Sequence, residues 1–230
     1  MREIINLNSN WSFSKEAGAI PAAIDTAWEV VNLPHSWNAI DGQDGGNDYY
    51  RGTAYYAKTL SKSELPVADR YYLEIRGANS SADVYINGKS LAHHDGGYST
   101  WRVDITESLS EGSLLAIAVD NSANDKVYPQ MADFTFYGGI YRDVNLICVN
   151  ESHFDLDYYG GPGIKVTPAV EGANAHVEVQ VYLTNAKEGQ TVKYTVYDKD
   201  ENVIASCESA ETIANLTIEN VHLWHGRKDP

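Results

Sequence analysis

The sequence of 230 residues predicts an all-β protein made of two β-sandwiches. Apolar and polar residues alternate with a period of two through most of the chain, and stretches with helical periodicity are almost absent. Turn sequences recur about every 8 to 12 residues, which is typical of β-sandwiches. The pattern changes near residue 150. We therefore expect a larger sandwich or jelly roll over residues 1–150 and an immunoglobulin-like sandwich over residues 151–230.

The larger block contains a predicted hairpin, formed by its second clear strand and a return strand. Tyr72–Arg76 and Ala82–Ile86 are strand-like runs, and Asn87-Gly88 follows the second run. This dipeptide is the strongest short hairpin signal, because both turn residues must accept a positive φ. A return strand is expected over Lys89–His93.

Two more strands and one helical turn are predicted before residue 150. Leu115, Ile117 and Val119 alternate with less apolar neighbours, and Val144–Val149 forms a continuous apolar strand. Asp104–Glu107 predicts a short capped helical turn, in which a carboxylate accepts hydrogen bonds from amides that the turn leaves free.

The second block begins with a segment that cannot hold a strand ladder and continues with antiparallel strand patterns. We expect a loop at 158–163 and a charged turn at 198–202. Strands are expected at 177–183, 192–196, 203–207 and 216–218. About 80 residues are few for an immunoglobulin-like sandwich, which usually has about 100. We therefore expect this sandwich to lack its C-terminal strand and to pair with another copy near residues 212–225.

Charge and hydropathy limit the function classes. The formal net charge is -15 and the pI is near 4.7, which argues against nucleic acid or an anionic membrane as a partner. No stretch approaches the roughly 20 apolar residues of a membrane helix. Residues 1–10 lack the apolar region of a signal peptide. A cytoplasmic protein is the expectation.

Cysteines and histidines give no strong signal for a cofactor. Cys148 and Cys207 both lie in strand-like runs, which favours two buried thiols over a disulfide. His93 and His94 precede Asp95, but neighbouring residues of a strand point to opposite faces, so one metal ion does not easily bind both. The same spacing argument applies to the HLWH sequence at 222–225. We expect no bound metal or other cofactor.

Residues 133–147, DFTFYGGIYRDVNLI, carry the best candidate for a binding site. Carbohydrate sites combine aromatic rings, which contact the C–H faces of sugars, with a few fixed polar groups. Asp133, Phe134 and Tyr137 beside a Gly-Gly pair suit that chemistry. Taken alone, these residues favour the other interpretation, a packed loop in which Asp133 begins a turn.

Three further residues, Arg142, Trp37 and Trp101, are expected to have structural roles. Arg142, next to Asp143, is expected to tie carbonyl groups or a carboxylate with its several donors. Core or interdomain packing is favoured over sugar stacking for Trp37 and Trp101. The sequence alone does not nominate the carboxylate pair of a glycosidase, because 32 Asp and Glu residues are present.

Five stretches, taken together in this order and spacing, resemble the amino-terminal region of glycoside hydrolase family 2. They are WEVVNLPHSWN (28–38), YRGTAYY (50–56), VYINGK (84–89), HDGGYSTWRVDIT (94–106) and YGGIYRDV (137–144). The sequence DFTFYGGIYRDV is most similar to the β-galactosidase branch, and β-glucuronidases and β-mannosidases share several of the same stretches.

The resemblance implies a fold and a division of labour. Residues 1–150 would be the jelly-roll, sugar-binding domain and residues 151–230 the immunoglobulin-like domain. Both catalytic glutamates of the family lie in a (β/α)8 barrel that follows them, and a barrel of about 250 residues is absent here. By this resemblance, the Asp133 side chain would contact the hydroxyl groups of the sugar. A monovalent cation would lie beside it only in some complete enzymes. Phe134 and Tyr137 would shape the wall.

A departure from the family pattern concerns Arg51. It stands where some β-galactosidases have a sugar-contacting Asn, so it either contacts substrate or forms a salt bridge within its loop.

The sequence therefore predicts the non-catalytic part of a retaining β-glycosidase, β-galactosidase-like, inactive by itself and acting on carbohydrate through the absent barrel. The parent could instead be a β-glucuronidase or β-mannosidase, and a homo-oligomer is possible. A stand-alone carbohydrate-binding module and a structural or adhesion sandwich pair are the alternatives from other classes.

Overall fold

The computed structural model describes residues 2–41, 48–128, 135–224 and 226–227. The chain divides into two compact units, Met1–Glu151 and Ser152–Pro230. Strands dominate both units, and the helical segments among the described residues are two single 3-10 turns, so the predicted all-β class is confirmed. No helix in the described part of the chain is long and apolar enough to cross a membrane.

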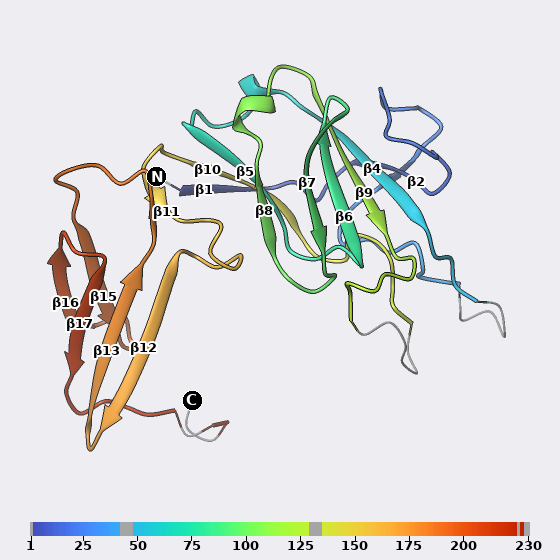
Figure 1. The fold of residues 1–230 in the computed structure, drawn as a ribbon. Helices are drawn as coiled ribbons and strands as arrows, with labels where there is room; N and C mark the ends of the chain where they lie inside the picture. The colour runs from blue at the N-terminus through green and yellow to red at the C-terminus, as the bar shows by residue number, and fades with distance from the viewer. Residues whose placement is uncertain (1, 42–47, 129–134, 225, 228–230) are drawn as a thin grey trace. The chain divides into compact units, whose positions relative to one another are not determined.

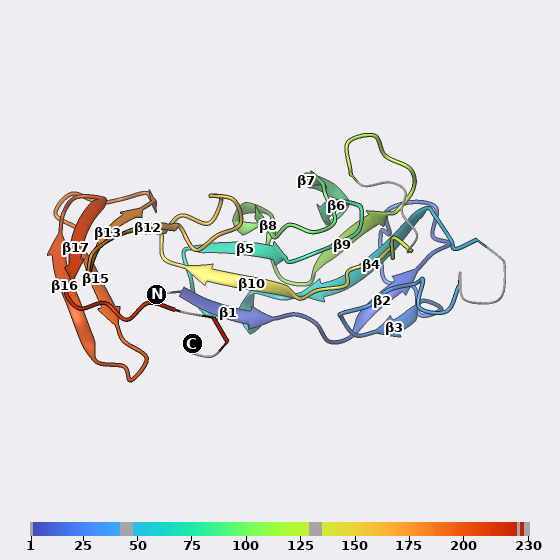
Figure 2. The same cartoon turned by 90° about the horizontal axis from the view of Figure 1, so that it is seen from below.

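Unit 1 is a sandwich of a four-stranded and a six-stranded antiparallel sheet (Figures 1 and 2). The four-stranded sheet has the order β1 (Arg2–Asn6), β10 (Val144–Val149), β5 (Arg70–Ile75), β8 (Trp101–Asp104). The six-stranded sheet has the order β3 (Glu29–Val31), β2 (Trp11–Ser14), β4 (Thr53–Leu60), β9 (Ser113–Asp120), β6 (Ser81–Ile86), β7 (Lys89–Asp95).

One hydrophobic core joins the two sheets of unit 1. β10 is buried along its whole length and pairs with β1 and β5 at its two edges. Its residue Leu146 pairs with Leu73 of β5, and both side chains belong to a buried cluster that includes Tyr56 and Ile117 of the other sheet. The predicted strand Val144–Val149 is thus confirmed, and it is central.

The predicted hairpin and helical turn are also confirmed. Asn87 and Gly88 connect β6 to β7 and have φ angles of 50° and 76°. The helical turn is the 3-10 turn η2 (Thr106–Ser108), and Asp104 Oδ1 accepts a hydrogen bond of 2.9 Å from the Thr106 N–H.

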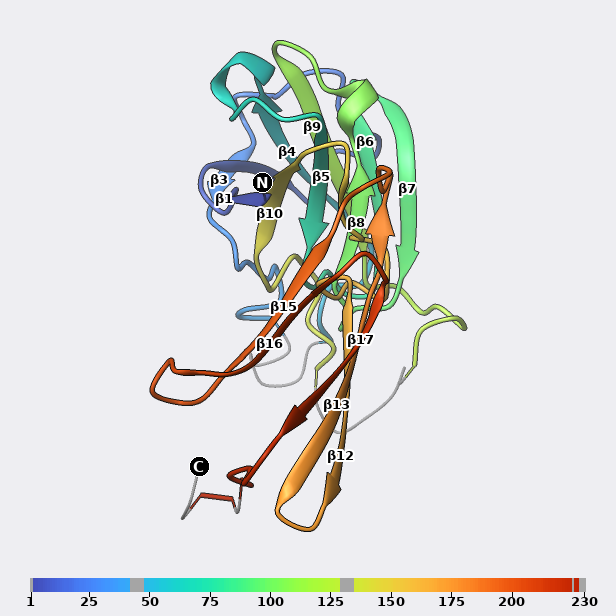
Figure 3. The same cartoon turned by 90° about the vertical axis from the view of Figure 1, so that its left-hand side faces the viewer.

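Unit 2 has a three-stranded sheet with the order β12 (Ile164–Glu171), β13 (Asn174–Val181), β17 (Ile213–Ile218), seen in Figure 3. Two strand pairs complete it: β15 (Val192–Tyr197) with β16 (Val203–Ser209), and β11 (His153–Phe154) with β14 (Leu183–Thr184). A second, smaller cluster of buried residues from β13, β15 and β17 forms its core. The charged turn predicted at 198–202 is present, with Asp198 Oδ1 accepting from the Asn202 N–H at 2.8 Å.

Several strands were not among the predicted ones, and β12 shows the reason. All eight of its residues are exposed and Pro168 lies in its middle, which suits an edge strand but interrupts the usual strand signal. Both cysteines are free thiols, as predicted. Cys148 in unit 1 is buried as expected, whereas Cys207 in unit 2 is only half-buried. Pairing of copies near residues 212–225 stays a prediction.

Candidate functional site

The Gly138–Gly139 pair is required by close approach of other segments. A Cβ on Gly138 would overlap the ring of Trp37 and the amide of Asn121. Gly139 has a φ of 122°, and a Cβ there would overlap the carbonyl oxygen of His35. The glycines thus let the loop that follows the aromatic stretch pass directly over buried groups.

A neutral pair of side chains lies beneath Gly139. His35 Nδ1 and the Tyr56 hydroxyl are 2.8 Å apart. Burial lowers the pKa of His35 and raises the pKa of Tyr56, so both groups stay uncharged at neutral pH. They support the loop and supply no charge to the site.

Asn38 ties the loop to two other segments. Its side chain is fully buried, and its Oδ1 accepts hydrogen bonds from the Gly138 N–H at 2.7 Å and from Asn121 Nδ2 at 3.1 Å. Its Nδ2 donates to the carbonyl of Tyr50 at 3.0 Å. One buried amide therefore fixes the relative positions of residues 50, 121 and 138.

Asn79 holds the other side of the loop. Its N–H donates to the Gly139 carbonyl at 3.0 Å, and its Nδ2 donates to the Tyr137 carbonyl at 2.9 Å. A Cβ on Gly97 would overlap the Asn79 side chain, which explains a glycine at that position. The backbone of residues 137–139 is thus fixed from both sides.

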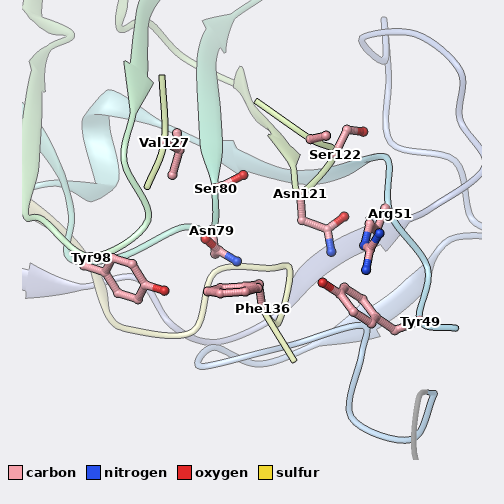
Figure 4. Close-up of a pocket in the computed structure, with 10 residues that line it drawn as sticks. Tyr49, Arg51, Asn79, Ser80, Tyr98, Asn121, Ser122, Val127 and Phe136 are labelled. Carbon is pink, nitrogen blue, oxygen red and sulfur yellow. The ribbon is translucent and has the colours of Figure 1, made fainter. Parts of the chain in front are cut away.

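These fixed segments enclose a hollow at one end of unit 1 (Figure 4). The described residues that line it are Tyr49, Arg51, Asn79, Ser80, Tyr98, Asn121, Ser122, Ala123, Val127 and Phe136. They come from the segments before β4, after β5, after β7 and after β9, together with the loop before Gly138. Aromatic rings beside amides, hydroxyls and one cation are the composition expected of a sugar-binding surface.

The structure places two of the four predicted site residues. Arg51 lines the hollow with a half-exposed side chain, 3.4 Å from Asp48. The expected salt bridge within the loop is therefore observed, and contact of Arg51 with substrate stays a prediction. Tyr137 is 40% exposed and is not among the lining residues, so its contact with sugar stays a prediction. Asp133 and Phe134 lie outside the described residues.

Phe136 was not among the predicted site residues, yet its ring lines the hollow. It belongs to the same aromatic stretch as Phe134 and Tyr137. No periodicity applies in this irregular loop, so the sequence does not indicate which ring faces inward.

The residues assigned to structure behave as predicted. Trp37 and Trp101 are both buried, with Trp37 stacked on Phe13 and Trp101 on His94. Arg142 ties carbonyl groups, donating to the Tyr98 carbonyl at 2.8 Å and the Arg76 carbonyl at 3.4 Å.

The adjacent histidines have separate environments. His93 contacts Asp83 at 2.8 Å and Asp95 at 3.1 Å, whereas His94 contacts Ser99 at 2.9 Å. Among the described residues, no group of three or more His, Cys, Asp or Glu is placed to hold a metal ion. Of the second histidine pair, His225 lies outside the described part of the chain.

Comparison with models of protein families shows to which family the chain belongs. The model for "Glycosyl hydrolases family 2, sugar binding domain" matches residues 4–150, which cover unit 1 almost completely. The chain belongs to glycosyl hydrolase family 2. The resemblance drawn from the sequence motifs is confirmed, and the hollow lies within the matched sugar-binding domain.

Two curated relatives in this family are enzymes named for different sugars. A β-glucuronidase from Bacteroides fragilis is 33% identical over all of this chain, which covers 34% of the relative. A β-galactosidase from Thermoanaerobacter pseudethanolicus is 26% identical over 97% of this chain, which covers 31% of that relative. The chain thus spans about a third of the length of these relatives.

Solved structures extend the comparison. An FMN-binding β-glucuronidase from Faecalibacterium prausnitzii L2-6 is 42% identical, with a TM-score of 0.88 over 97% of this chain and 35% of the other. The structure of a putative β-galactosidase from Bacteroides fragilis is 31% identical, with a TM-score of 0.86 over 99% of this chain and 37% of the other.

Proposed function

We propose that this chain is the amino-terminal, non-catalytic part of a retaining β-glucuronidase. The observation that carries the proposal is the 42% identity to a β-glucuronidase structure over 97% of this chain. The β-galactosidase expected from the sequence motifs becomes the second candidate, because the Thermoanaerobacter pseudethanolicus β-galactosidase is 26% identical, against 33% for the Bacteroides fragilis β-glucuronidase. The putative β-galactosidase of known structure, at 31% identity, supports that second candidate.

In this proposal unit 1 lends the hollow to an active site whose carboxylate pair lies elsewhere in the polypeptide. Retaining hydrolysis needs two carboxyl groups about 5 to 5.5 Å apart on either side of the scissile bond. The hollow holds one charged side chain among its described lining residues, the guanidinium of Arg51. Its chemistry is therefore binding and orientation of the sugar, with Asp133 proposed on the hydroxyl groups.

A substrate panel tests the proposal. The longer polypeptide that the proposal requires is assayed against 4-nitrophenyl β-D-glucuronide, β-D-galactoside and β-D-mannoside, with purified residues 1–230 as the comparison. We expect turnover of the glucuronide by the longer polypeptide, at a higher kcat/KM than the other two, and none by residues 1–230. Preference for the galactoside would overturn the glucuronidase assignment. Turnover by residues 1–230 would overturn the non-catalytic role.

A further inference from the structure

A short segment that follows β9, residues 121–127, forms a wall between the hollow and a second groove of unit 1. On one side the segment lines the hollow, where Asn121, Ser122 and Val127 are seen in Figure 4. On the other side Ser122 and Ala123 also line the groove, together with side chains of β6 and β7. A contact made in this groove therefore acts on a wall of the hollow.

Asn124 organises the end of this segment. Its Oδ1 accepts a hydrogen bond from the Lys126 N–H at 2.9 Å, and its carbonyl accepts one from the Val127 N–H at 3.2 Å. The two bonds close a turn over residues 124–127 and fix Val127, which is 6% exposed and lines the hollow. The position of the Asn124 amide therefore determines where this part of the wall lies.

Asp95, the last residue of β7, holds the Asn124 amide from the groove. Its Oδ1 accepts hydrogen bonds from Asn124 Nδ2 at 2.9 Å and from Ser81 Oγ at 2.8 Å. Asn124 Nδ2 also donates to Ser81 Oγ at 2.8 Å, so β6, β7 and the segment meet in one network. Hydrogen bonds to a carboxylate are roughly twice as strong as those between neutral groups, which makes Asp95 the central member.

His93 connects this network to pH. Its Nδ1 lies 2.8 Å from Asp83 Oδ1 and its Nε2 lies 3.1 Å from Asp95 Oδ1. Both contacts are hydrogen bonds only when each ring nitrogen carries a proton. The hydrogen bond to Asp83 raises the pKa of His93 above 6.5. Loss of the proton leaves the two carboxylates with one donor fewer between them.

The other charged groups near His93 do not replace this hydrogen bond. Lys126 Nζ lies 3.6 Å from Asp95 Oδ2 on a side chain that is 70% exposed, so that ion pair is weak. Asp120 accepts hydrogen bonds from a hydroxyl and a backbone N–H, and Asp125 is exposed. His94 points to the other face of β7. The groove thus connects segments of unit 1, with most of its carboxylates already hydrogen bonded.

We propose that Asp95 is a positioning residue for the sugar-binding hollow, which holds residues 121–127 through the Asn124 amide, and that the proton of His93 strengthens this hold. Substrate binding then weakens when Asp95 loses a donor, while the chemical step is unchanged. The part of the inference that concerns substrate rests on the proposed function, since it assumes that the hollow contacts the sugar.

Hydrogen exchange of residues 1–230, followed by NMR, tests the hold on the segment without any substrate. Asp95→Ala removes the acceptor, and Asn124→Asp places two carboxylates against each other. The double variant Asp95→Asn/Asn124→Asp restores one donor and one acceptor with the native net charge. Asp125→Ala, in the same groove, is the charge-matched control.

The amides of Lys126 and Val127 report directly on the turn. Their exchange should be at least about tenfold faster in Asp95→Ala and in Asn124→Asp, as expected from losing a hydrogen bond to a charged group. It should return to within about threefold of native in the double variant and stay native in Asp125→Ala. Slow exchange of the β4 and β9 amides in each variant shows that the fold is kept.

Kinetics of the longer polypeptide test the consequence for substrate, with whichever of the three 4-nitrophenyl glycosides it turns over. KM should rise by about fivefold or more in Asp95→Ala, with kcat within about twofold of native. The ratio of KM in His93→Gln to native KM should be about two- to fivefold near pH 6 and should approach one above the folded pKa of His93. A merely structural role would lower the amount of active enzyme and leave KM unchanged.

Native exchange at Lys126 and Val127 in both single variants would overturn the inference, as would a double variant no slower than Asn124→Asp. If Asp95→Ala does not fold, Asn124→Asp and the double variant decide by the same amides. Faster exchange with an unchanged KM, or a KM ratio for His93→Gln that does not change with pH, would overturn the role in substrate binding. None of these outcomes depends on which glycoside is preferred, so the glucuronidase assignment is judged separately.

Discussion

At the residue scale, Gly138 is the position where a single methyl group should do most damage to the hollow. The variant Gly138→Ala places a Cβ against the ring of Trp37 and should lower the free energy of unfolding by about 1 to 3 kcal/mol, as overpacking does. Urea unfolding measures the change. In the double variant Gly138→Ala/Trp37→Phe, the loss of unfolding free energy should be smaller than the sum of the losses measured for the two single variants. Additive losses would show that Trp37 is not the cause.

His93 and His94 should titrate on opposite sides of the ordinary histidine value. The hydrogen bond to Asp83 raises the pKa of His93 above 6.5, and burial lowers the pKa of His94 below 6.5. Donating to both Asp83 and Asp95 requires a proton on each ring nitrogen of His93. An NMR titration of the ring protons measures both values, and the reverse order would contradict the geometry.

The same histidine predicts a small pH dependence of stability. Because the folded pKa of His93 is raised, its contribution is complete below about pH 6.5 and is lost as the pH rises through the folded pKa. The side chain is half-exposed, so the effect should be below about 1 kcal/mol. The difference in unfolding free energy between the native chain and His93→Gln should therefore shrink at alkaline pH. A difference that grows would reverse the sign.

Residue identity in the site was only partly predictable. Arg51 became a candidate through the family motif. Its salt bridge within the loop is observed and it lines the hollow, and its contact with substrate stays a prediction. Phe136 was missed, because an irregular loop has no period that tells inward from outward rings. Positions 138 and 139 require glycine because a Cβ there would overlap Trp37 and His35. These two residues are about 100 positions away in the sequence, so local sequence patterns do not reveal the requirement.

At the element scale, a row of polar side chains crosses the four-stranded sheet. Asn6, Asn145, Glu74 and Arg102 are paired in sequence across β1, β10, β5 and β8. Glu74 is 4% exposed, and it accepts hydrogen bonds from Arg102 at 2.7 Å and from Asn145 at 3.0 Å. The row thus joins three strands of this sheet by hydrogen bonds, and the connection between β5 and β8 is ionic.

Removing Glu74 should be strongly destabilising. Glu74→Ala leaves the guanidinium of Arg102, itself 8% exposed, without this carboxylate, which typically costs about 3 to 5 kcal/mol. Glu107→Ala, at an exposed position of η2, is the control and should change little. Chemical unfolding followed by circular dichroism measures both. A loss for Glu74→Ala no larger than that of the control would contradict a stabilising row.

Low pH should reduce the contribution of this polar row to the free energy of unfolding. Burial opposes ionisation of Glu74, but hydrogen bonds from Asn145, Arg76 and Arg102 outweigh it and lower the pKa. A lowered folded pKa gives stability that is present above the unfolded value, near 4.5, and is lost as the pH falls through the folded value. The native chain should lose this contribution at acid pH, and Glu74→Gln should lack that component of the pH dependence.

Strand prediction succeeded where burial and pattern agree. Val144–Val149 is central and continuously apolar, and its predicted bounds match the structure. β12 was missed because it is an exposed edge strand whose Pro168 resembles a break in the pattern.

At the scale of the whole molecule, unit 1 should fold without unit 2, since it has its own core of buried residues. Cys148 reports on this directly, because burial raises the pKa of its thiol to about 11. In a fragment of residues 1–151 this thiol should react with a disulfide reagent only as fast as the unit unfolds, and as slowly as in the full chain carrying Cys207→Ser. Rapid labelling of the native fragment would show that unit 1 depends on unit 2.

The central claim is that this chain supplies substrate contacts, while catalysis occurs in another part of a longer enzyme. The most direct measurement is kcat/KM for 4-nitrophenyl β-D-glucuronide in the longer polypeptide carrying Asp133→Asn, compared with Asp125→Asn at an exposed position. Loss of a charged hydrogen bond to a sugar hydroxyl should reduce kcat/KM by about 10- to 100-fold, with unfolding unchanged and the Asp125→Asn control near native. A value for Asp133→Asn within about twofold of native would contradict the claim.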